Sequence, residues 1–520
     1  MLTKSQPDEI QDFLIDASHM HGGYADRIVL PENAAEIAKV LAKASASQMP
    51  VTVSGAGTGT VGGRVPFGGI VLATDRLNRI KSIVHENGSG RATAEAGVML
   101  STLQKAVEAE KLFYPPDPTE GSCFLGGTVA TNASGARTFK YGPTRNYVER
   151  LQIVLATGEM IDLRRGELRA DAQGQIKLPL SSGRVVEAQL PSYQMPPTRK
   201  HAAAYYVAPG LDVLDLFIGS EGTLGVIVEI EVKLIPQPLG LMSAVVFFED
   251  EANLLTFVQE VRRLSLLTRA GQARTQQTIG FPGKGHAESE WEALTSIGID
   301  ARALEYFDHQ SLGFLRQKYP EIPEDAVGAI FFEQETTSET EDDFAAVWFS
   351  ILQANKAMLD QSWFATNVKD QARLREFRHQ LPVLMNEWFA RYDQQKVSTD
   401  MAVPDEEFPG MLRFYQDTLR AEKLKYTIFG HIGDNHVHVN ILPRDDNEGR
   451  LAREIYLKFI RRAVAVGGTI SAEHGIGKLK RQYLGELYGE NHLREMAALK
   501  RAFDPAGILG RGNIFADTYL

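Results

Sequence analysis

Residues 53–72 read VSGAGTGTVGGRVPFGGIVL, a glycine-dense stretch that directly follows a short apolar segment. The spacing Gly57-x-Gly59-x-x-Gly62 formally matches the fingerprint of a nicotinamide-binding Rossmann unit. That unit requires a helix to begin at once and an acidic residue to follow about 20 positions later. Residues 61–72 contain glycines and a proline, which a helix interior does not tolerate. Two other interpretations remain: a run of structural turns, or a loop whose backbone N–H groups wrap a phosphate.

Two further stretches have the same character. Residues 121–145 read GSCFLGGTVATNASGARTFKYGPTR, and residues 217–227 read FIGSEGTLGVI. In both stretches, glycines allow the backbone to approach a ligand closely, and short polar side chains supply hydrogen bonds. Three such loops favour the phosphate interpretation and indicate a large, extended ligand that carries a polyphosphate.

Taken in this order, the three stretches resemble the flavin-binding segments of the vanillyl-alcohol oxidase/PCMH-type FAD-binding fold. Within that superfamily the chain resembles the D-2-hydroxyacid dehydrogenases, which include D-lactate dehydrogenase, D-2-hydroxyglutarate dehydrogenase and the flavin subunit of glycolate oxidase. The resemblance implies noncovalent FAD, because the first loop has no histidine where related oxidases attach the flavin. The residues implied to hold the pyrophosphate are Ser54, Gly55, Ala56, Gly57, Thr58 and Gly59. Those implied to lie along the rest of FAD are Gly121, Ser122, Asn132, Gly135, Glu221 and Ile227.

A second group of chemistry-bearing residues lies far along the chain, where residues 429–440 read FGHIGDNHVHVN. Residues 433–435, Gly-Asp-Asn, are typical of a turn, and they predict a bend that could bring His431 near His438. Residues 471–475 read SAEHG. Two imidazoles and a carboxylate could bind a divalent metal with an open position, leaving an adjacent histidine to act as a base. On residue types alone, each histidine is more often a hydrogen-bonded structural residue, and the presence of both clusters shifts the balance toward a metal site.

The same two stretches resemble the active-site motifs GHxGDGNxHxN and SAEHGxG of the D-2-hydroxyacid dehydrogenases. The resemblance implies that His431, His438 and Glu473 bind a divalent metal, Zn or Mn. It also implies that Asn440 contacts the substrate and that His474 is the base. The sequence departs from the motif at two positions, with asparagine at 435 where glycine is usual and histidine at 436 where asparagine is usual. The first change alters the turn, and the second could replace a ligand.

An anionic substrate also needs cationic side chains. Arg378 and Lys396 resemble the carboxylate-binding arginine and lysine of the family, and Lys200 resembles a lysine near the flavin. The planar fork of arginine matches a carboxylate through two hydrogen bonds. Near the C-terminus, residues 510–513 replace the usual Asn-Pro-Gly-Lys, which leaves the C-terminal contact to the flavin undefined.

The resemblance implies an α+β fold. We expect a PCMH-type FAD-binding domain of two subdomains over residues 1–236, and a cap or substrate domain with an antiparallel sheet and helices over 237–470. Residues 471–520 would complete the active site and the FAD domain. The glycine- and proline-rich residues 113–145 are expected to be a long functional segment, and the polar residues 165–210 a loop or excursion.

Composition narrows the function classes. The chain has 520 residues, a net charge of −11 and no long basic block, which argues against nucleic-acid partners. Its single cysteine, Cys123, excludes an intramolecular disulfide and a four-thiolate cluster, and is expected to be a small packed residue. With no apolar run long enough to span a membrane and no secretory signal, a cytoplasmic protein is expected. A peripheral position at the membrane and a homodimer are both left open.

The implied reaction is oxidation of a small anionic D-2-hydroxy acid, similar to D-lactate, to the 2-oxo acid. The metal would lower the pKa of the hydroxyl group, His474 would remove its proton, and hydride would pass to flavin N5. Electrons would then leave to a separate acceptor: a quinone, an electron-transfer flavoprotein, an iron–sulfur subunit or a cytochrome. The alternatives are a same-fold flavoenzyme for an aromatic 2-hydroxy acid, an ether-lipid synthase, a flavin-carrying electron-transfer subunit, and a metal-dependent hydrolase without flavin.

Overall fold

The computed structural model describes residues 1–271 and 298–520, which divide into two compact units. Unit 1 consists of residues 1–135, 142–237 and 469–520, and unit 2 consists of residues 136–141 and 238–468. Across the described residues, every helix is too short or too polar to span a bilayer.

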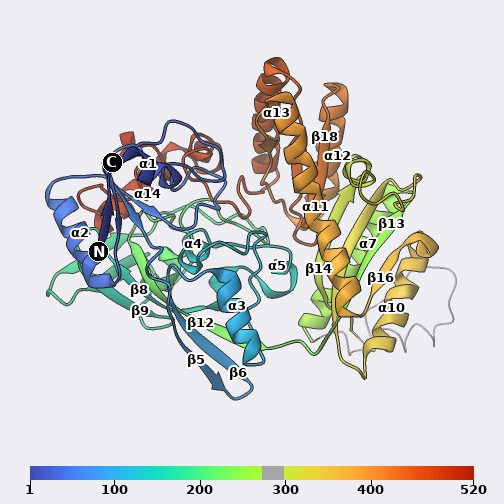
Figure 1. The fold of residues 1–520 in the computed structure, drawn as a ribbon, viewed down its shortest axis with the longest axis horizontal. Helices are drawn as coiled ribbons and strands as arrows, with labels where there is room; N and C mark the ends of the chain where they lie inside the picture. The colour runs from blue at the N-terminus through green and yellow to red at the C-terminus, as the bar shows by residue number, and fades with distance from the viewer. Residues whose placement is uncertain (272–297) are drawn as a thin grey trace. The chain divides into compact units, whose positions relative to one another are not determined.

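Unit 1 contains a small sheet and a larger antiparallel one (Figure 1). In the small sheet, β4 pairs in parallel with both β2 and β3, and β1 pairs antiparallel with β2. The larger sheet has the order β5-β6-β12-β8-β9, with β7 also paired to β12. The strands of the two sheets are β1 (Leu2–Lys4), β2 (Arg27–Leu30), β3 (Val51–Ser54), β4 (Ile70–Ala73), β5 (Ile80–Glu86), β6 (Ser89–Glu95), β7 (Leu112–Phe113), β8 (Val148–Val154), β9 (Met160–Arg164) and β12 (Val226–Pro236).

The helices of unit 1 are set by local sequence signals and by burial. Asn33 caps α2 by accepting from the backbone N–H of Glu36, and the apolar face of that helix packs on strands of both sheets through Ile37, Val40 and Leu41. This helix was predicted. The α-helices of the unit are α1 (Pro7–Ile10), α2 (Ala34–Ala46), α3 (Leu100–Ala109), α4 (Leu125–Ala130), α6 (Val213–Phe217) and α14 (Leu484–Phe503).

The C-terminal residues return to the N-terminal part of unit 1. Figure 1 shows α14, in red, beside the blue elements of the N-terminus. The backbone N–H of Val51 donates to Ile508, and that of Gly510 donates back to Val51. The buried Lys500 binds Asp504 at 2.6 Å and the carbonyl of Thr223 at 2.9 Å. Strand β3, and with it the start of the first glycine stretch, is therefore fixed by residues more than 400 positions away.

Two expectations about irregular segments need correction. Residues 113–145, expected to be a long segment without regular structure, contain α4 and the short helix α5 (Thr138–Tyr141). Residues 165–210 contain a hairpin of β10 (Gln175–Pro179) and β11 (Val185–Gln189). In each strand of the hairpin, buried and exposed side chains alternate over only five residues. Polar residues dominate so short a segment, so its sequence resembles that of a loop.

Unit 2 is built on an antiparallel sheet with the order β16-β13-β15-β14-β18-β19-β17. Its strands are β13 (Gly240–Phe248), β14 (Ala301–Asp308), β15 (Gly328–Thr336), β16 (Trp363–Ala365), β17 (Val397–Ser398), β18 (Tyr426–Gly430) and β19 (His438–Ile441). Its α-helices in the described residues are α5, α7 (Glu251–Arg269), α9 (His309–Leu315), α10 (Glu341–Ala354), α11 (Val368–Tyr392), α12 (Phe408–Ala421) and α13 (Asp446–Ala465). The expected α+β class with an antiparallel sheet in this region is confirmed.

Adjacent phenylalanines of β15 show how the helices cover this sheet. Phe331 belongs to the apolar cluster that includes Phe377 and Leu381 of α11. Phe332 faces the other way and stacks on Trp348 of α10, with 3.9 Å between ring centroids. Side chains alternate across a strand, so α11 covers one face of the sheet and α10 the other.

Candidate functional site

The first glycine stretch leaves β3 as a loop with unpaired backbone donors. In the described part of the chain, no backbone N–H of residues 55–59 donates a hydrogen bond. Gly57 has φ +82°, and a Cβ at this position would lie 2.5 Å from the guanidinium carbon of Arg64. Successive N–H groups without protein partners form a concave site for an anion. The loop therefore fits the pyrophosphate of a dinucleotide.

Arg64, which the sequence did not single out, lies against this loop. Its Nη1 donates to the carbonyl of Gly55 at 2.7 Å and to Ser54 Oγ at 3.2 Å, and its Nε donates to Ile15 at 2.8 Å. Burial lowers the pKa of the guanidinium below its usual value, but arginine remains a cation at neutral pH. Unit 1 therefore holds a positive charge beside the proposed pyrophosphate loop.

The second and third glycine stretches are joined by backbone hydrogen bonds. The N–H of Gly219 donates to Val129 at 3.0 Å, and the N–H of Glu221 donates to Ala130 at 2.8 Å. Asn132 adopts φ +48°, and its Oδ1 accepts from the backbone of Arg145 at 3.0 Å. The two stretches therefore lie side by side, as binding of one ligand to both would require.

Two residues near the C-terminus connect the first stretch to the third. Asn513 Nδ2 donates to the carbonyls of Gly63 at 2.9 Å and Glu221 at 3.1 Å. Lys478 Nζ donates to Asn513 Oδ1 at 2.8 Å and to Gly63 at 3.2 Å, and burial lowers the pKa of this lysine to about 8. The sequence showed that residues 510–513 depart from the usual family motif. It did not predict that Asn513 links the first stretch to the third.

The remaining residues expected along FAD are also in unit 1. Gly121 accepts from the N–H of Ser101, and Ser122 donates to Glu120 through both its N–H and its hydroxyl. A Cβ at Gly135 would lie 1.9 Å from the carbonyl oxygen of Asp117, so only glycine fits there. Ile227 is in β12, directly after the third stretch. The unpaired donors of the first loop and the convergence of the three stretches together fit FAD.

The Glu473–His474 pair belongs to this unit as well. Glu473 Oε2 accepts from Lys200 Nζ at 3.2 Å and from Ser134 Oγ at 3.3 Å. Lys200, which is 1% exposed, also donates to the carbonyl of Gly135 at 3.1 Å. His474 Nε2 lies 3.7 Å from Glu473 Oε1. Lys200 therefore ties the carboxylate of Glu473 to the second glycine stretch.

Glu221 holds the segment that follows His474. Its two carboxylate oxygens accept the N–H groups of Ile476 at 2.7 Å and Gly477 at 2.6 Å. Burial raises the pKa of Glu221 to about 7, although these hydrogen bonds favour the ionised form. A Cβ at Gly475, which has φ +80°, would lie 2.9 Å from the same carboxylate. Glu221 was expected to lie along FAD, and in the structure its carboxylate also holds the backbone that directly follows the SAEHG segment.

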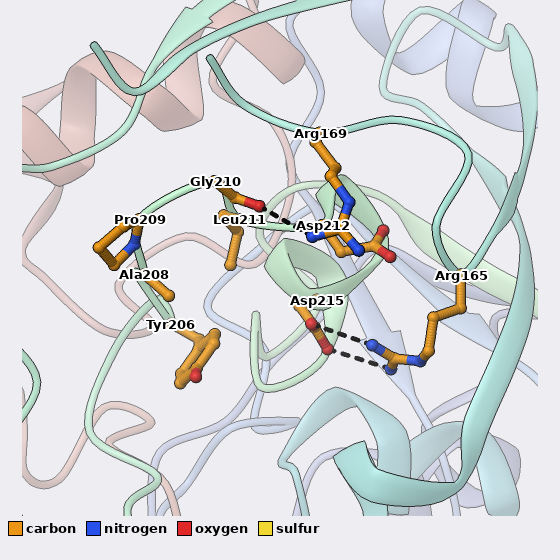
Figure 2. A pocket seen from close by; sticks show the side chains of 9 residues that line it. All are labelled: Arg165, Arg169, Tyr206, Ala208, Pro209, Gly210, Leu211, Asp212 and Asp215. Carbon is orange, nitrogen blue, oxygen red and sulfur yellow. Dashed lines mark hydrogen bonds and ion pairs between the residues drawn. The ribbon is translucent and has the colours of Figure 1, made fainter. Parts of the chain in front are cut away.

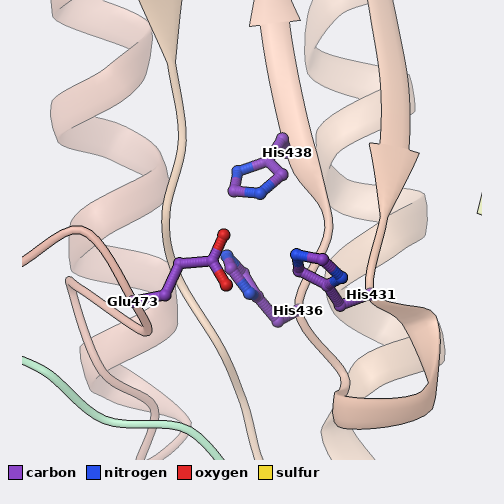
Figure 3. A group of neighbouring side chains, drawn as sticks. All are labelled: His431, His436, His438 and Glu473. Carbon is purple, nitrogen blue, oxygen red and sulfur yellow. The ribbon is translucent and has the colours of Figure 1, made fainter. Parts of the chain in front are cut away.

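In unit 2, the turn between β18 and β19 gathers three histidines. Asn435 adopts the left-handed conformation, with φ +53°. The family motif has glycine at this position, and asparagine is one of the few other residues that adopt this conformation. The chain reverses here, and Figure 3 shows the imidazoles of His431, His436 and His438 close together. Each ring offers a nitrogen within 4.8 Å of those of the other two. The predicted approach of His431 to His438 is confirmed, with 5.7 Å between ring centroids.

A hydrogen-bond acceptor lies against two of the three imidazoles. His431 Nδ1 lies 2.6 Å from Glu305 Oε1, and His438 Nδ1 lies 3.0 Å from the carbonyl of Thr399. Such acceptors fix the tautomer and orientation of metal-binding histidines. With Nδ1 as the donor, both rings keep Nε2 as the ligand atom. The donor set therefore fits a divalent metal. Glu473, also drawn in Figure 3, belongs to unit 1.

The expected substrate-binding residues are all in unit 2. Arg378 Nε donates to Glu305 Oε2 at 3.1 Å, which links this arginine to the acceptor of His431. Asn440 is buried, its Nδ2 donates to the carbonyl of His438 at 3.3 Å, and its Oδ1 has no hydrogen-bond partner among the described residues. Lys396 is exposed, just before β17. Glu305 was missed because nothing in its local sequence marks it.

Two other features of unit 1, the thiol of Cys123 and a cavity, show no sign of a catalytic, metal-binding or cofactor-binding role. Burial raises the pKa of the Cys123 thiol to about 12, so the thiol stays protonated, in keeping with a packed residue. A cavity of about 260 Å³ in unit 1 contains none of the expected site residues (Figure 2). Arg165 and Asp215, which line it, form an ion pair. The cavity is lined by Arg165, Arg169, Tyr206, Ala208, Pro209, Gly210, Leu211, Asp212 and Asp215.

Comparison with known families gives two matches along the chain. Residues 25–164 match the family described as "FAD binding domain", and residues 279–514 match "FAD linked oxidases, C-terminal domain". An alkyldihydroxyacetonephosphate synthase of known structure matches with a TM-score of 0.60 at 16% identity, covering 94% of this chain and 77% of that one. At this identity the likeness concerns the fold alone. The expected PCMH-type FAD-binding fold is confirmed.

Similar proteins span nearly the whole chain. The D-lactate dehydrogenase of Anaerostipes hadrus is 30% identical over 518 residues, covering 98% of this chain and 93% of the relative. Glycolate oxidase subunit GlcD of Bacillus subtilis is 28% identical, with 96% and 91% covered. D-2-hydroxyglutarate dehydrogenase of Xanthomonas citri pv. viticola is 27% identical, with 98% and 94% covered.

Proposed function

Because this chain belongs to the D-2-hydroxyacid dehydrogenase group of the FAD-linked oxidoreductases, we propose that it oxidises a small D-2-hydroxy acid, similar to D-lactate, to the 2-oxo acid. One observation carries the proposal. The loop of Glu473 and His474 is bound to the second glycine stretch through Lys200 and to the third through Glu221. This arrangement supports a proton acceptor next to the cofactor segments of the same unit.

The reaction removes one proton from the hydroxyl group and one hydride equivalent from the α-carbon. FAD, when bound, supplies the two-electron acceptor, and a divalent ion supplies positive charge that favours the ionised hydroxyl. We assign the ion to His431, His438 and Glu473, the residues of the family-type ligand set. His474 takes the hydroxyl proton on its imidazole, and the neighbouring carboxylate of Glu473 stabilises the resulting imidazolium.

Substrate binding is assigned to residues of unit 2. Arg378 and Lys396 would hold the substrate carboxylate, and their positive charges suit an anion. Asn440 would contact the substrate through its amide, whose buried Oδ1 lacks a partner among the described residues. A buried acceptor of this kind is costly until something donates to it, so a hydroxyl-bearing substrate would satisfy it.

The reduced flavin must pass its electrons to a separate acceptor, because one cysteine cannot hold an iron–sulfur cluster. A relative that is named as a subunit of glycolate oxidase supports such a division of labour. We propose a quinone, an electron-transfer flavoprotein, an iron–sulfur subunit or a cytochrome as the class of acceptor. Among the alternatives, the hydrolase is disfavoured by the FAD-binding match, which covers the first glycine stretch.

The test is the visible absorption spectrum of the purified protein under anaerobic conditions, recorded before and after addition of D- and L-2-hydroxy acids. Bleaching of the flavin by a D-acid and not by its L-enantiomer is the expected result. The His474→Gln variant should bind FAD but bleach far more slowly. Flavin that no 2-hydroxy acid bleaches would contradict the proposed substrate class while leaving the family assignment intact.

A further inference from the structure

We propose that His436 is a third imidazole ligand of the metal, backed by Asp400, so that unit 2 supplies a three-histidine site suited to Zn²⁺. This inference deepens the proposed function and rests on it for the two ligands His431 and His438. His436 stands where the family motif has asparagine, a residue that cannot offer an imidazole.

The geometry of the cluster supports three ligands rather than two. The ring centroid of His436 lies 4.5 Å from that of His438 and 5.5 Å from that of His431. A nitrogen of each ring lies within 4.8 Å of those of the other two. His436 is completely buried and His431 is 4% exposed. Buried imidazoles that converge in this way make a ready donor set for one ion.

Asp400 places a carboxylate beside the ring of His436. Asp400 Oδ1 lies 3.2 Å from His436 Nε2, and the exposed fraction of both side chains is zero. Beside His431 and His438, Glu305 and the carbonyl of Thr399 face Nδ1, whereas Asp400 faces Nε2 of His436. A carboxylate beside one ring nitrogen favours an orientation in which the other nitrogen, here Nδ1 of His436, is the metal ligand.

The chemistry of three imidazole ligands determines which divalent ion the site prefers. Imidazole suits Zn²⁺ and Co²⁺, whereas Mg²⁺ and Mn²⁺ prefer carboxylate, carbonyl and water oxygens. The carboxylates of Glu305 and Asp400, which lie beside His431 and His436, offset part of the charge of the ion. A third imidazole therefore shifts the preference from the Zn or Mn expected for the family-type set toward Zn²⁺.

A purely structural role for His436 makes a different prediction. Its backbone bridges to Ala402, and the N–H of Val403 donates to the carbonyl of Asn435, so the turn is already attached to the segment that carries Asp400. If the His436–Asp400 pair served only this attachment, its loss would lower thermal stability and leave metal binding unchanged.

The experiment uses FAD-loaded full-length protein, stripped of metal with a chelator and titrated with Co²⁺ as a spectroscopic probe, followed by Zn²⁺ and Mn²⁺ competition. The variants are His436→Asn, Asp400→Asn and Glu473→Gln. His309→Asn, an exposed histidine of the same unit, is the matched control. Flavin content and the unfolding midpoint verify that each variant is folded. His436→Gln and Asp400→Asn serve if His436→Asn does not fold.

We expect one Co²⁺ per chain, displaced by Zn²⁺ but not by Mn²⁺. His436→Asn should change the visible Co²⁺ spectrum and weaken binding by more than about 100-fold, and Asp400→Asn should weaken it by about 10- to 100-fold. Glu473→Gln, which removes the proposed carboxylate ligand, should bind Co²⁺ more weakly than the wild type but keep the three histidine ligands, and the control should match the wild type. An unchanged Co²⁺ spectrum and affinity in His436→Asn, or no metal binding by the wild type, would overturn the inference.

The two proposals can fail separately. If the Co²⁺ spectrum depends on His436 but no D-2-hydroxy acid bleaches the flavin, the three-histidine site stands and the proposed substrate class is wrong. If a D-acid bleaches the flavin while the His436→Asn variant binds Co²⁺ like the wild type, the proposed function stands and His436 is not a ligand.

Discussion

Glu305 of β14 lies 2.6 Å from His431 Nδ1, although 126 residues separate the two in the chain. The other carboxylate oxygen of Glu305 accepts from Arg378 Nε at 3.1 Å, and the Glu305 side chain is 4% exposed. One buried carboxylate thus orients an imidazole of the histidine cluster and pairs with the arginine assigned to the substrate. Glu305 is a positioning residue, since it acts through His431 and Arg378.

Replacing Glu305 by glutamine should impair the site without removing a ligand. The amide keeps the shape but loses the charge that orients His431 and pairs with Arg378, so Zn²⁺ affinity and kcat/KM should fall by about 10- to 100-fold. Metal titration and anaerobic flavin reduction would measure the two effects. The exposed Glu376 of α11 provides the matched control, Glu376→Gln. Equal metal affinity in Glu305→Gln and the control would contradict the positioning role.

Glycine at position 57 should be required for FAD binding. The Gly57→Ala variant introduces a Cβ at φ +82° and 2.5 Å from the Arg64 guanidinium carbon, beside the unpaired N–H groups of the loop. FAD content after purification should therefore drop strongly. Gly88, with φ +84° and no atom within 4 Å of its Cβ position, supplies the control Gly88→Ala. If both variants lose FAD equally, backbone strain and not the loop is responsible.

Replacing Lys200 should destabilise the protein, because it removes the cation that compensates the buried charge of Glu473. The Lys200→Met variant leaves the Glu473 carboxylate without its ammonium partner, and both side chains are buried. The free energy of unfolding should fall by about 3 kcal/mol, as is typical when one partner of a buried pair is removed. Urea denaturation would measure it. The double variant Lys200→Met/Glu473→Gln should recover much of the loss, and no recovery would argue against the pairing.

The raised pKa of Glu221 should make stability depend on pH. The pKa rises from 4.5 in the unfolded chain to about 7 in the folded protein, so between these values the folded state holds a proton that the unfolded state releases. The free energy of unfolding should then decrease as the pH rises through this window, by about 3 kcal/mol in total.

The Glu221→Gln variant tests this linkage. Its single amide oxygen can still accept one of the two N–H groups, of Ile476 or of Gly477, and the side chain has no proton to lose. Denaturation curves at several pH values between 4.5 and 7.5 should show a flatter dependence for the variant than for the wild type. Parallel curves for the two proteins would show that Glu221 does not titrate in this range.

Much of the fold could be predicted because its signals are local. The Asn33 cap and the apolar spacing that follows it specify α2, and the turn chemistry around residue 435 predicts the reversal that brings His431 and His438 together. The short hairpin of β10 and β11 and the helices within residues 113–145 were missed. Their apolar faces are too short for a periodic pattern to stand out.

The sequence by itself determined the glycine stretches, the histidine segment and the SAEHG loop, because each depends on residue types at close spacing. Only the tertiary structure decided which distant groups support them: Arg64 beside the first loop, Glu221 beneath the SAEHG loop, Glu305 beside His431 and Asp400 beside His436. These residues carry no local signature, since a buried carboxylate or guanidinium acquires its role only from the partner that the folded chain brings within hydrogen-bond distance.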